Sequence, residues 1–163
     1  MEVSSFSEIE AEFMARVKRI VWCSVATVDT RGRPRTRILH PNWEGTTGWV
    51  CTGRNTIKAR HLAANPYVSL SYWDQKQENV YVEATAEWED DPREKRRVWD
   101  LFKANPFPYG YDPSLIPGWT APDAPGFGIL KLTPWRIELS GFSLEPGVAV
   151  PRSVWHAPRR HKA

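Results

Sequence analysis

The chain has 163 residues, with 22 Lys and Arg side chains against 19 Asp and Glu, and a hydrophobic content of 41%. This length suits one domain with a sizeable core, and the composition excludes a wholly disordered chain. No apolar run approaches the ~20 residues that a membrane span needs, and we expect no secretory leader. Two isolated cysteines, Cys23 and Cys51, argue against a disulfide-rich secreted protein. We therefore predict a cytoplasmic protein with reduced thiols.

The net charge of +3 at pH 7 arises in the C-terminal tail. Four of the 22 basic side chains lie within residues 152–163, and removing them leaves 18 basic side chains against 19 acidic ones. A short basic tail of this kind is typically solvated and flexible. We predict a single domain over residues 1–150, a flexible tail over residues 151–163, and no nucleic-acid partner.

The first half of the chain alternates between short helical and strand patterns. Apolar side chains at helical spacing predict a helix over residues 7–20, begun by a capping box of Ser7 and Glu10. The period then changes to the value of two that is typical of strands. We expect strands at residues 20–28, 35–40 and 49–52, a short helix at residues 57–64, and further strands at residues 67–73 and 80–88.

The second half begins with a strong helix start, Asp91 followed by Pro92, and that helix is expected to end near residue 104. A proline-rich loop follows over residues 105–126, and loops of this length in compact domains are typically functional or disordered. The last expected strands cover residues 128–132 and 136–140. Short, closely spaced strands with few helices predict an antiparallel barrel with helices at its ends, not a doubly wound α/β fold.

A basic cluster occurs where a predicted strand leads into a helix. Arg37 lies in an early strand, Thr52 ends the next one, and Lys58 lies in the first turn of the following helix. Free backbone N–H groups and the helix dipole favour an anion at a helix start. With the hydroxyl groups of Thr52 and Thr56, this set suits one phosphate group, although a solvated basic surface uses the same residue types.

The segment from Gly32 to Trp88 resembles the pyridoxamine 5′-phosphate oxidase-like family of flavin-binding split β-barrels. The shared features are a Gly-x-Pro turn, an Arg-led apolar strand, a strand ending in Thr, a Lys-Ala helix start and an Asn-Pro-x-Val-Ser-Leu strand. They occur here at Gly32-x-Pro34, Arg37-Ile38-Leu39, Thr52, Lys58-Ala59 and residues 65–70. The resemblance covers about the central third of the chain. It implies a mainly β (α+β) fold, an antiparallel split β-barrel with short flanking helices.

The resemblance also implies a cofactor site for FMN at the interface of a homodimer. Arg37 and Lys58 would hold the flavin phosphate, and the backbone of residues 38–40 would follow the edge of the isoalloxazine ring. The residues implied to bind the cofactor are Arg37, Ile38, Leu39, His40, Cys51, Thr52, Lys58 and Asn79. The implied activity is an FMN-dependent oxidoreductase that transfers hydride to or from an unidentified small organic substrate.

Two alternatives use the same fold. A reductase with the 8-hydroxy-5-deazaflavin coenzyme would need positive charge for a long acidic tail, for which Arg54, Arg60 and the terminal basic cluster are candidates. The second alternative is a non-catalytic protein that binds a flavin or a haem. A haem would need His40 or His61 as its axial ligand, because the remaining histidines lie in the tail.

The sequence departs from the vitamin B6 oxidases at two places. Ile57 stands where those enzymes have a basic residue beside the matched lysine, and residues 139–151 contain no R-x-H motif. Both departures argue against pyridoxamine phosphate oxidation as the specific reaction. The catalytic residues are not indicated by any motif.

Three aromatic residues of the proline-rich loop, Tyr109, Tyr111 and Trp119, are predicted to form a lid over a flat ring. The loop lacks the periodicity of core segments, and aromatic side chains on a stiff loop are suited to covering a ligand. Cysteines and histidines do not occur at metal-ligand spacing, so no metal site is predicted.

Overall fold

The computed structural model describes residues 1–143 and 145–158. The strands are β1 (Glu2–Val3), β2 (Cys23–Val28), β3 (Pro34–Leu39), β4 (Asn42–Glu44), β5 (Thr47–Gly53), β6 (Tyr67–Trp73), β7 (Glu78–Glu89), β8 (Phe127–Gly141) and β9 (Ser153–His156). The helices are α1 (Glu10–Ile20), α2 (Ile57–Ala64) and α3 (Pro92–Ala104), with 3₁₀ turns at Phe6–Glu8 and Pro113–Leu115. None of the helices in these two described ranges is long and apolar enough to cross a membrane.

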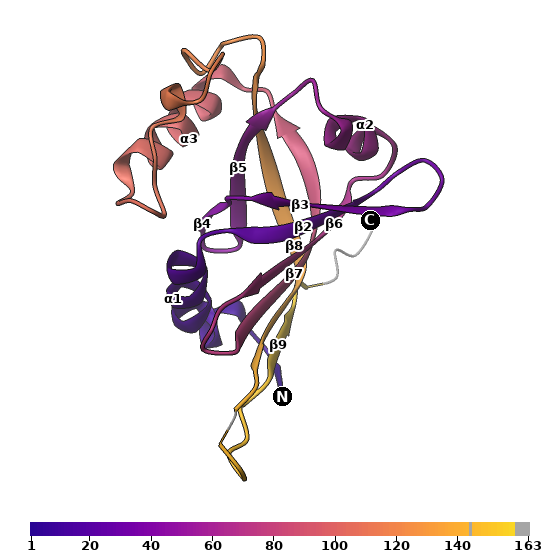
Figure 1. Cartoon of the computed structure of the whole chain (residues 1–163), viewed down its shortest axis with the longest axis vertical. Coiled ribbons are helices and arrows are strands. Elements are labelled where there is room, and N and C mark those ends of the chain that lie inside the picture. The colour runs from indigo at the N-terminus through magenta and orange to yellow at the C-terminus, as the bar shows by residue number, and fades with distance from the viewer. Residues whose placement is uncertain (144, 159–163) are drawn as a thin grey trace.

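The strands form one mostly antiparallel sheet in the order β1-β9-β8-β7-β6-β2-β3, with β5 paired to β8 and to β4. The long strand β8 has β7 on one edge, while on the other its first half pairs with β5 and its second half pairs with β9. Sharing β8 between β5 and β9 curls the sheet and divides it (Figure 1). The predicted split barrel is confirmed.

Strand β8 runs through Pro134, where the sequence predicted a break between two strands. The register with β7 shifts between Glu83 and Ala84, and Pro134 lies opposite Ala84 at that irregularity. A bulge is one of the few places in a sheet where a residue without an N–H group is tolerated. The predicted strands over residues 128–132 and 136–140 are therefore one continuous strand.

Helix α1 begins at Glu10, later than predicted, and the predicted capping box of Ser7 and Glu10 is wrong. The Glu8 carboxylate instead accepts hydrogen bonds from the backbone N–H groups of Ser4 and Ser5, which stabilises the 3₁₀ turn before α1. The apolar face of α1 packs into the barrel core, where the Phe13 ring meets the Trp43 ring edge-on at 5.2 Å. Burial of this face fixes α1 across one end of the barrel.

Helix α3 begins as predicted, because the Asp91 side chain accepts a hydrogen bond of 2.8 Å from the backbone N–H of Arg93. Its apolar face forms a second hydrophobic cluster with β5, β8 and the proline-rich loop. The buried members of that cluster are Trp49, Cys51, Val98, Trp99, Phe102, Ala124, Phe127 and Ile129. Figure 1 shows α1 and α3 on one side of the strands and α2 on the other.

Residues 153–156, which the sequence placed in a flexible tail, form β9 instead. Val154 and Trp155 are buried, and β9 pairs with both β8 and β1. The Arg152 side chain donates hydrogen bonds of 2.7 and 2.8 Å to the two carboxylate oxygens of Glu138. The prediction of a flexible tail rested on the charged residues and gave no weight to the two apolar residues at the centre of this segment. Burial of these two side chains favours the pairing of β9 with its neighbouring strands. Arg159, Arg160 and Lys162 lie outside the described residues.

Candidate functional site

The predicted basic cluster forms where the start of α2 meets β2 and β3. Lys58 lies in the first turn of α2, and its Nζ donates a hydrogen bond of 3.2 Å to Thr56 Oγ1. The Arg37 guanidinium crosses β2, and its Nη1 donates to Val25 O at 3.1 Å and to Thr27 Oγ1 at 2.8 Å. The Arg37 cation of β3 and the Lys58 cation of α2 thus lie near enough for the Arg37 charge to act on Lys58. We call Arg37, Thr56 and Lys58 the basic cradle.

The basic cradle contains two like charges and no acid. Burial lowers the pKa of Arg37, and burial together with the Arg37 charge lowers the pKa of Lys58. Neither side chain forms an ion pair with any acidic group in the described part of the chain, whereas other arginines do so (Arg19, Arg33, Arg54, Arg97, Arg136 and Arg152). Two cations that repel each other and lack a carboxylate are suited to an external anion, because the anion relieves both the repulsion and the desolvation.

The predicted cofactor-edge residues lie on the outermost strand of the sheet. Strand β3 pairs with β2 alone, so one edge of its backbone is unpaired within the described residues. Ile38 is 64% exposed on the outer face of that strand, and Leu39 packs against the barrel core. An exposed strand edge offers a row of N–H and C=O groups to a ligand. This backbone is free to bind a planar ring through its polar edge.

Asn79, the remaining predicted ring contact, lies at the start of β7 opposite Trp73. Strands β6 and β2 separate β7 from β3. With about 4.8 Å between neighbouring strands, the path along the sheet from Asn79 to β3 is about 14 Å. Within one copy of the chain, Asn79 and residues 38–40 are therefore three strand spacings apart along the sheet.

The sequence profile of the pyridoxamine 5′-phosphate oxidase family matches residues 9–141, most of the chain and all but its first and last strands. The chain belongs to the pyridoxamine 5′-phosphate oxidase-like family. Members of this family bind FMN, and some bind F420. The profile extends beyond the central segment on which the sequence resemblance rested.

Relatives and solved structures agree with this family membership. A pyridoxine/pyridoxamine 5′-phosphate oxidase of Paraburkholderia phytofirmans is 45% identical over 62 residues, which are 37% of this chain and 29% of that protein. The fold is similar to that of an FMN-binding protein from Nostoc punctiforme, with a TM-score of 0.70, 17% identity, and coverage of 98% of this chain and 94% of the other. It is also similar to an F420 reductase, with a TM-score of 0.54, 19% identity, and coverage of 76% and 93%.

Both histidines considered as haem ligands are engaged by protein groups. His40 Nε2 lies 2.8 Å from the Tyr109 carbonyl oxygen, and His61 Nδ1 lies 2.9 Å from Thr27 Oγ1. Burial lowers the pKa of His40, although the bond to Tyr109 opposes this effect. Within residues 1–143 and 145–158, no three His, Cys, Asp or Glu side chains gather in a way that suits a metal ion. His40 therefore connects its segment to the loop that contains Tyr109, and His61 connects α2 to β2.

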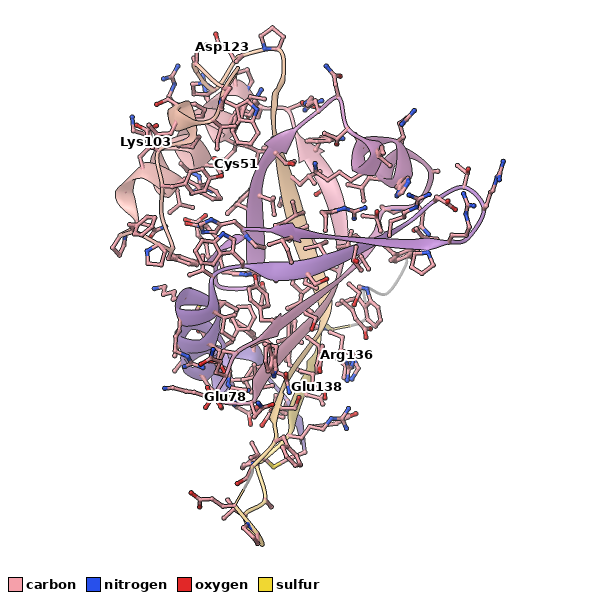
Figure 2. The ribbon with its side chains drawn as sticks, in the orientation of Figure 1. Cys51, Glu78, Lys103, Asp123, Arg136 and Glu138 are labelled. Atoms are coloured by element: carbon pink, nitrogen blue, oxygen red, sulfur yellow. The ribbon has the colours of Figure 1, made fainter. Side chains whose placement is uncertain are left out.

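Cys51 and Thr52 lie on β5 and are both buried. The Cys51 side chain belongs to the second hydrophobic cluster, next to Tyr111, and burial raises its pKa far above the ordinary value. Figure 2 shows Cys51 high on β5. Its thiol therefore packs in the interior, and only the backbone of Cys51 is suited to ligand contact. Cys23 lies in the barrel core, where burial raises its pKa to about 12.

The predicted lid residues are packed against the protein. Tyr109 is only 4% exposed, its carbonyl oxygen accepts a hydrogen bond from Asn42 Nδ2, and its hydroxyl oxygen accepts one from the backbone N–H of Trp43. Tyr111 and Trp119 pack against the second hydrophobic cluster. The expectation that Tyr109 covers a ligand from an open loop is wrong, because hydrogen bonds to β4 hold this residue in the interior. No periodic pattern in the sequence indicates these hydrogen bonds.

A shallow cleft of about 600 Å³ lies beside the basic cradle. Its lining residues are Arg54, Asn55, Thr56, Ile57, Ala59, Arg60 and Ala63, so it meets the cradle only at Thr56. Arg54 forms an ion pair with Asp90 and lies over the Trp88 ring at 4.6 Å. Of the two arginines predicted to receive an acidic tail, one is therefore already neutralised.

Thr27, a buried residue of β2 that contacts both Arg37 and His61, was not predicted as part of the site. A single hydroxyl group inside an apolar strand gives no motif. The only signal available was the polar side chain at a position where the alternating pattern calls for an apolar one.

Proposed function

We propose that this protein is an FMN-dependent oxidoreductase that acts on a small organic substrate. The observation that carries the proposal is the basic cradle, in which Arg37 and Lys58 repel each other and neither has an acidic partner in the described ranges. A phosphate monoester supplies the negative charge that this arrangement lacks. Membership of a flavin-binding family supports the same assignment.

Each part of the site suits one part of FMN. Arg37, Lys58 and the start of α2 would bind the phosphate, and the unpaired edge of β3 at residues 38–40 would bind the polar edge of the ring. When bound, FMN supplies the hydride-transfer chemistry. The chain's own groups orient the ring, neutralise the phosphate and exclude water from the buried side of the cradle.

FMN suits this site better than a deazaflavin coenzyme with a long acidic tail. The cleft that continues from Thr56 offers Arg60 for such a tail, but the Arg54 charge is already neutralised by Asp90. The compact pair of cations is sufficient for one terminal phosphate. The F420 reductase with a similar fold makes the deazaflavin coenzyme the second candidate.

We further propose that the protein is a homodimer with the cofactor at its interface. The outer face of β2, β3, β6 and β7 exposes large apolar side chains, namely Ile38, Tyr67, Trp73 and Tyr81. Between them, Ser24, Ala26, Ser69 and Ser71 keep the face flat. A flat face with large apolar side chains is typical of an interface. A second copy would also supply an Asn79 side chain, which within one copy lies three strands from β3.

Titration of the purified protein with FMN, riboflavin and F420, followed by flavin fluorescence and visible absorption, tests the cofactor assignment. We expect saturable binding of FMN that is at least about tenfold tighter than that of riboflavin, which lacks the phosphate. Tighter binding of F420 would transfer the function to the deazaflavin candidate. Equal binding of FMN and riboflavin would contradict the role of the basic cradle.

Light scattering coupled to size-exclusion chromatography tests the dimer. The Ser69→Arg substitution places a long charged side chain at the centre of the flat face, and we expect a monomer that has lost FMN. The Gln75→Arg control adds the same side chain in the exposed turn between β6 and β7 and should remain dimeric. A dimeric Ser69→Arg protein that retains FMN would refute this interface.

A further inference from the structure

Three polar side chains form a hydrogen-bonded chain behind the basic cradle, running from β3 through β2 to α2. Arg37 Nη1 donates to Thr27 Oγ1 at 2.8 Å, and Thr27 Oγ1 lies 2.9 Å from His61 Nδ1. Thr27 is 2% exposed and His61 is 7% exposed. Buried polar groups of this kind are costly unless they are hydrogen-bonded, so these bonds keep the three side chains in one arrangement.

The chemistry of these groups fixes the direction of one of the two hydrogen bonds. A guanidinium has donors only, so Thr27 Oγ1 must accept from Arg37. Thr27 Oγ1 keeps its own hydrogen and a second lone pair, so it can donate to His61 Nδ1 or accept from it, according to the tautomer of His61. The hydrogen-bonded series therefore begins at the Arg37 cation and ends at the His61 ring in α2.

The same bonds divide the donors of Arg37 into two sets. Both protein acceptors, Val25 O and Thr27 Oγ1, are bound by Nη1. No acceptor in the described part of the chain is bound by Nε or Nη2 of Arg37. Those two nitrogens form the fork that binds two oxygens of a phosphate at once. The protein thus binds one corner of the guanidinium and leaves the opposite side for a ligand.

Arg37 needs this support because of its position. It lies on the outermost strand, and its sequence neighbours Thr36 and Ile38 are exposed. A free arginine side chain on such a strand would sample many rotamers, and restricting them on binding costs conformational entropy. An arginine already held in one orientation avoids that loss when the anion arrives.

We propose that Thr27 and His61 are positioning residues that hold the Arg37 guanidinium ready for the cofactor phosphate. This inference rests on the proposed FMN function. It assigns to His61 a role through Thr27 and Arg37, without contact between His61 and the cofactor.

The test compares dissociation constants for FMN and riboflavin in variants of Thr27. Thr27→Val removes the hydroxyl group and keeps the shape, and we expect FMN binding to weaken by about five- to tenfold while riboflavin binding stays unchanged. Thr27→Ser keeps the hydroxyl group and should restore FMN binding. Thr133→Val, at an exposed position in β8, is the matched control and should bind both ligands like the unmodified protein.

A second pair of variants tests the contribution of His61. His61→Asn retains a hydrogen-bonding group near the position of Nδ1, whereas His61→Leu removes it, so FMN affinity should fall more in the leucine variant. In an Arg37→Ala background, Thr27→Val should have no further effect on FMN affinity, because the two residues act through one group. Additive losses in that double variant would overturn the inference.

The outcomes separate this inference from the proposed function. If the unmodified protein binds FMN and riboflavin equally, the phosphate assignment fails and the positioning role fails with it. If FMN is preferred but Thr27→Val weakens both ligands alike, or neither, the cradle stands and the positioning role is refuted.

Discussion

Replacing Lys58 by methionine should stabilise the protein without cofactor and weaken its binding of FMN. Burial and the Arg37 charge lower the pKa of Lys58, so the folded protein disfavours the ammonium group. Because Lys58 is only half-buried, solvent screening limits the gain on its removal to about 0.5–1 kcal/mol at pH 7. The lost charge-assisted bond to phosphate is worth about 1.5–3 kcal/mol, which corresponds to about 10- to 150-fold in the FMN dissociation constant.

The pH dependence of the same variant has a definite sign. A folded-state pKa below 10.5 means that the unfolded chain binds the Lys58 proton more tightly than the folded protein does. The stability of the unmodified protein therefore gains a contribution as the pH rises from the folded-state pKa of Lys58 towards 10.5, and Lys58→Met lacks that gain. The stability advantage of the variant should be largest near neutral pH and should shrink as the pH approaches 10.5.

Urea denaturation of the cofactor-free proteins between pH 7 and 10 measures the stability difference, and fluorescence titration measures FMN affinity. Lys76→Met, which removes an exposed lysine from the turn between β6 and β7, is the control and should change neither quantity. If Lys58→Met lowers stability at pH 7 and binds FMN like the unmodified protein, the view of the cradle as an unneutralised anion site is refuted.

Three further predictions concern the scaffold. Asp91→Ala should lower the free energy of unfolding by about 1 kcal/mol in urea denaturation, because α3 loses its N-cap. The hydrogen bond from Arg152 lowers the pKa of Glu138 to about 2, so its stabilisation is present above pH 4.5 and lost as the pH falls through 2. Glu138→Gln should therefore cost about 1–2 kcal/mol at pH 7 and almost nothing near pH 2. Cys23 and Cys51 are buried, with raised pKa values, and a thiol reagent should label both only after unfolding.

The sequence predicted Lys58 from a local feature, the start of a helix after a strand that ends in Thr52. It predicted Arg37 from the strand motif of the family, while the approach of β3 to α2 depends on the pairing of β3 with β2. Thr27 and its contact with His61 were missed because that contact depends on how α2 packs on β2, which no spacing within either element shows. Tyr109 was misassigned for the same reason, since its hydrogen bonds reach β4 from a distant loop.

The amino-acid sequence by itself determined the class of fold, the α3 N-cap and the ordered set of motifs that identify the family, because each depends on periodicity or on neighbouring residues. Only the tertiary structure decided that β8 is one strand shared by β5 and β9, and that residues 153–156 belong to the sheet. Pairing between distant strands is chosen by the burial of apolar side chains across the whole sheet. The same long-range packing leaves Arg37 and Lys58 facing each other without an acid, and that arrangement is the basis for the proposed function.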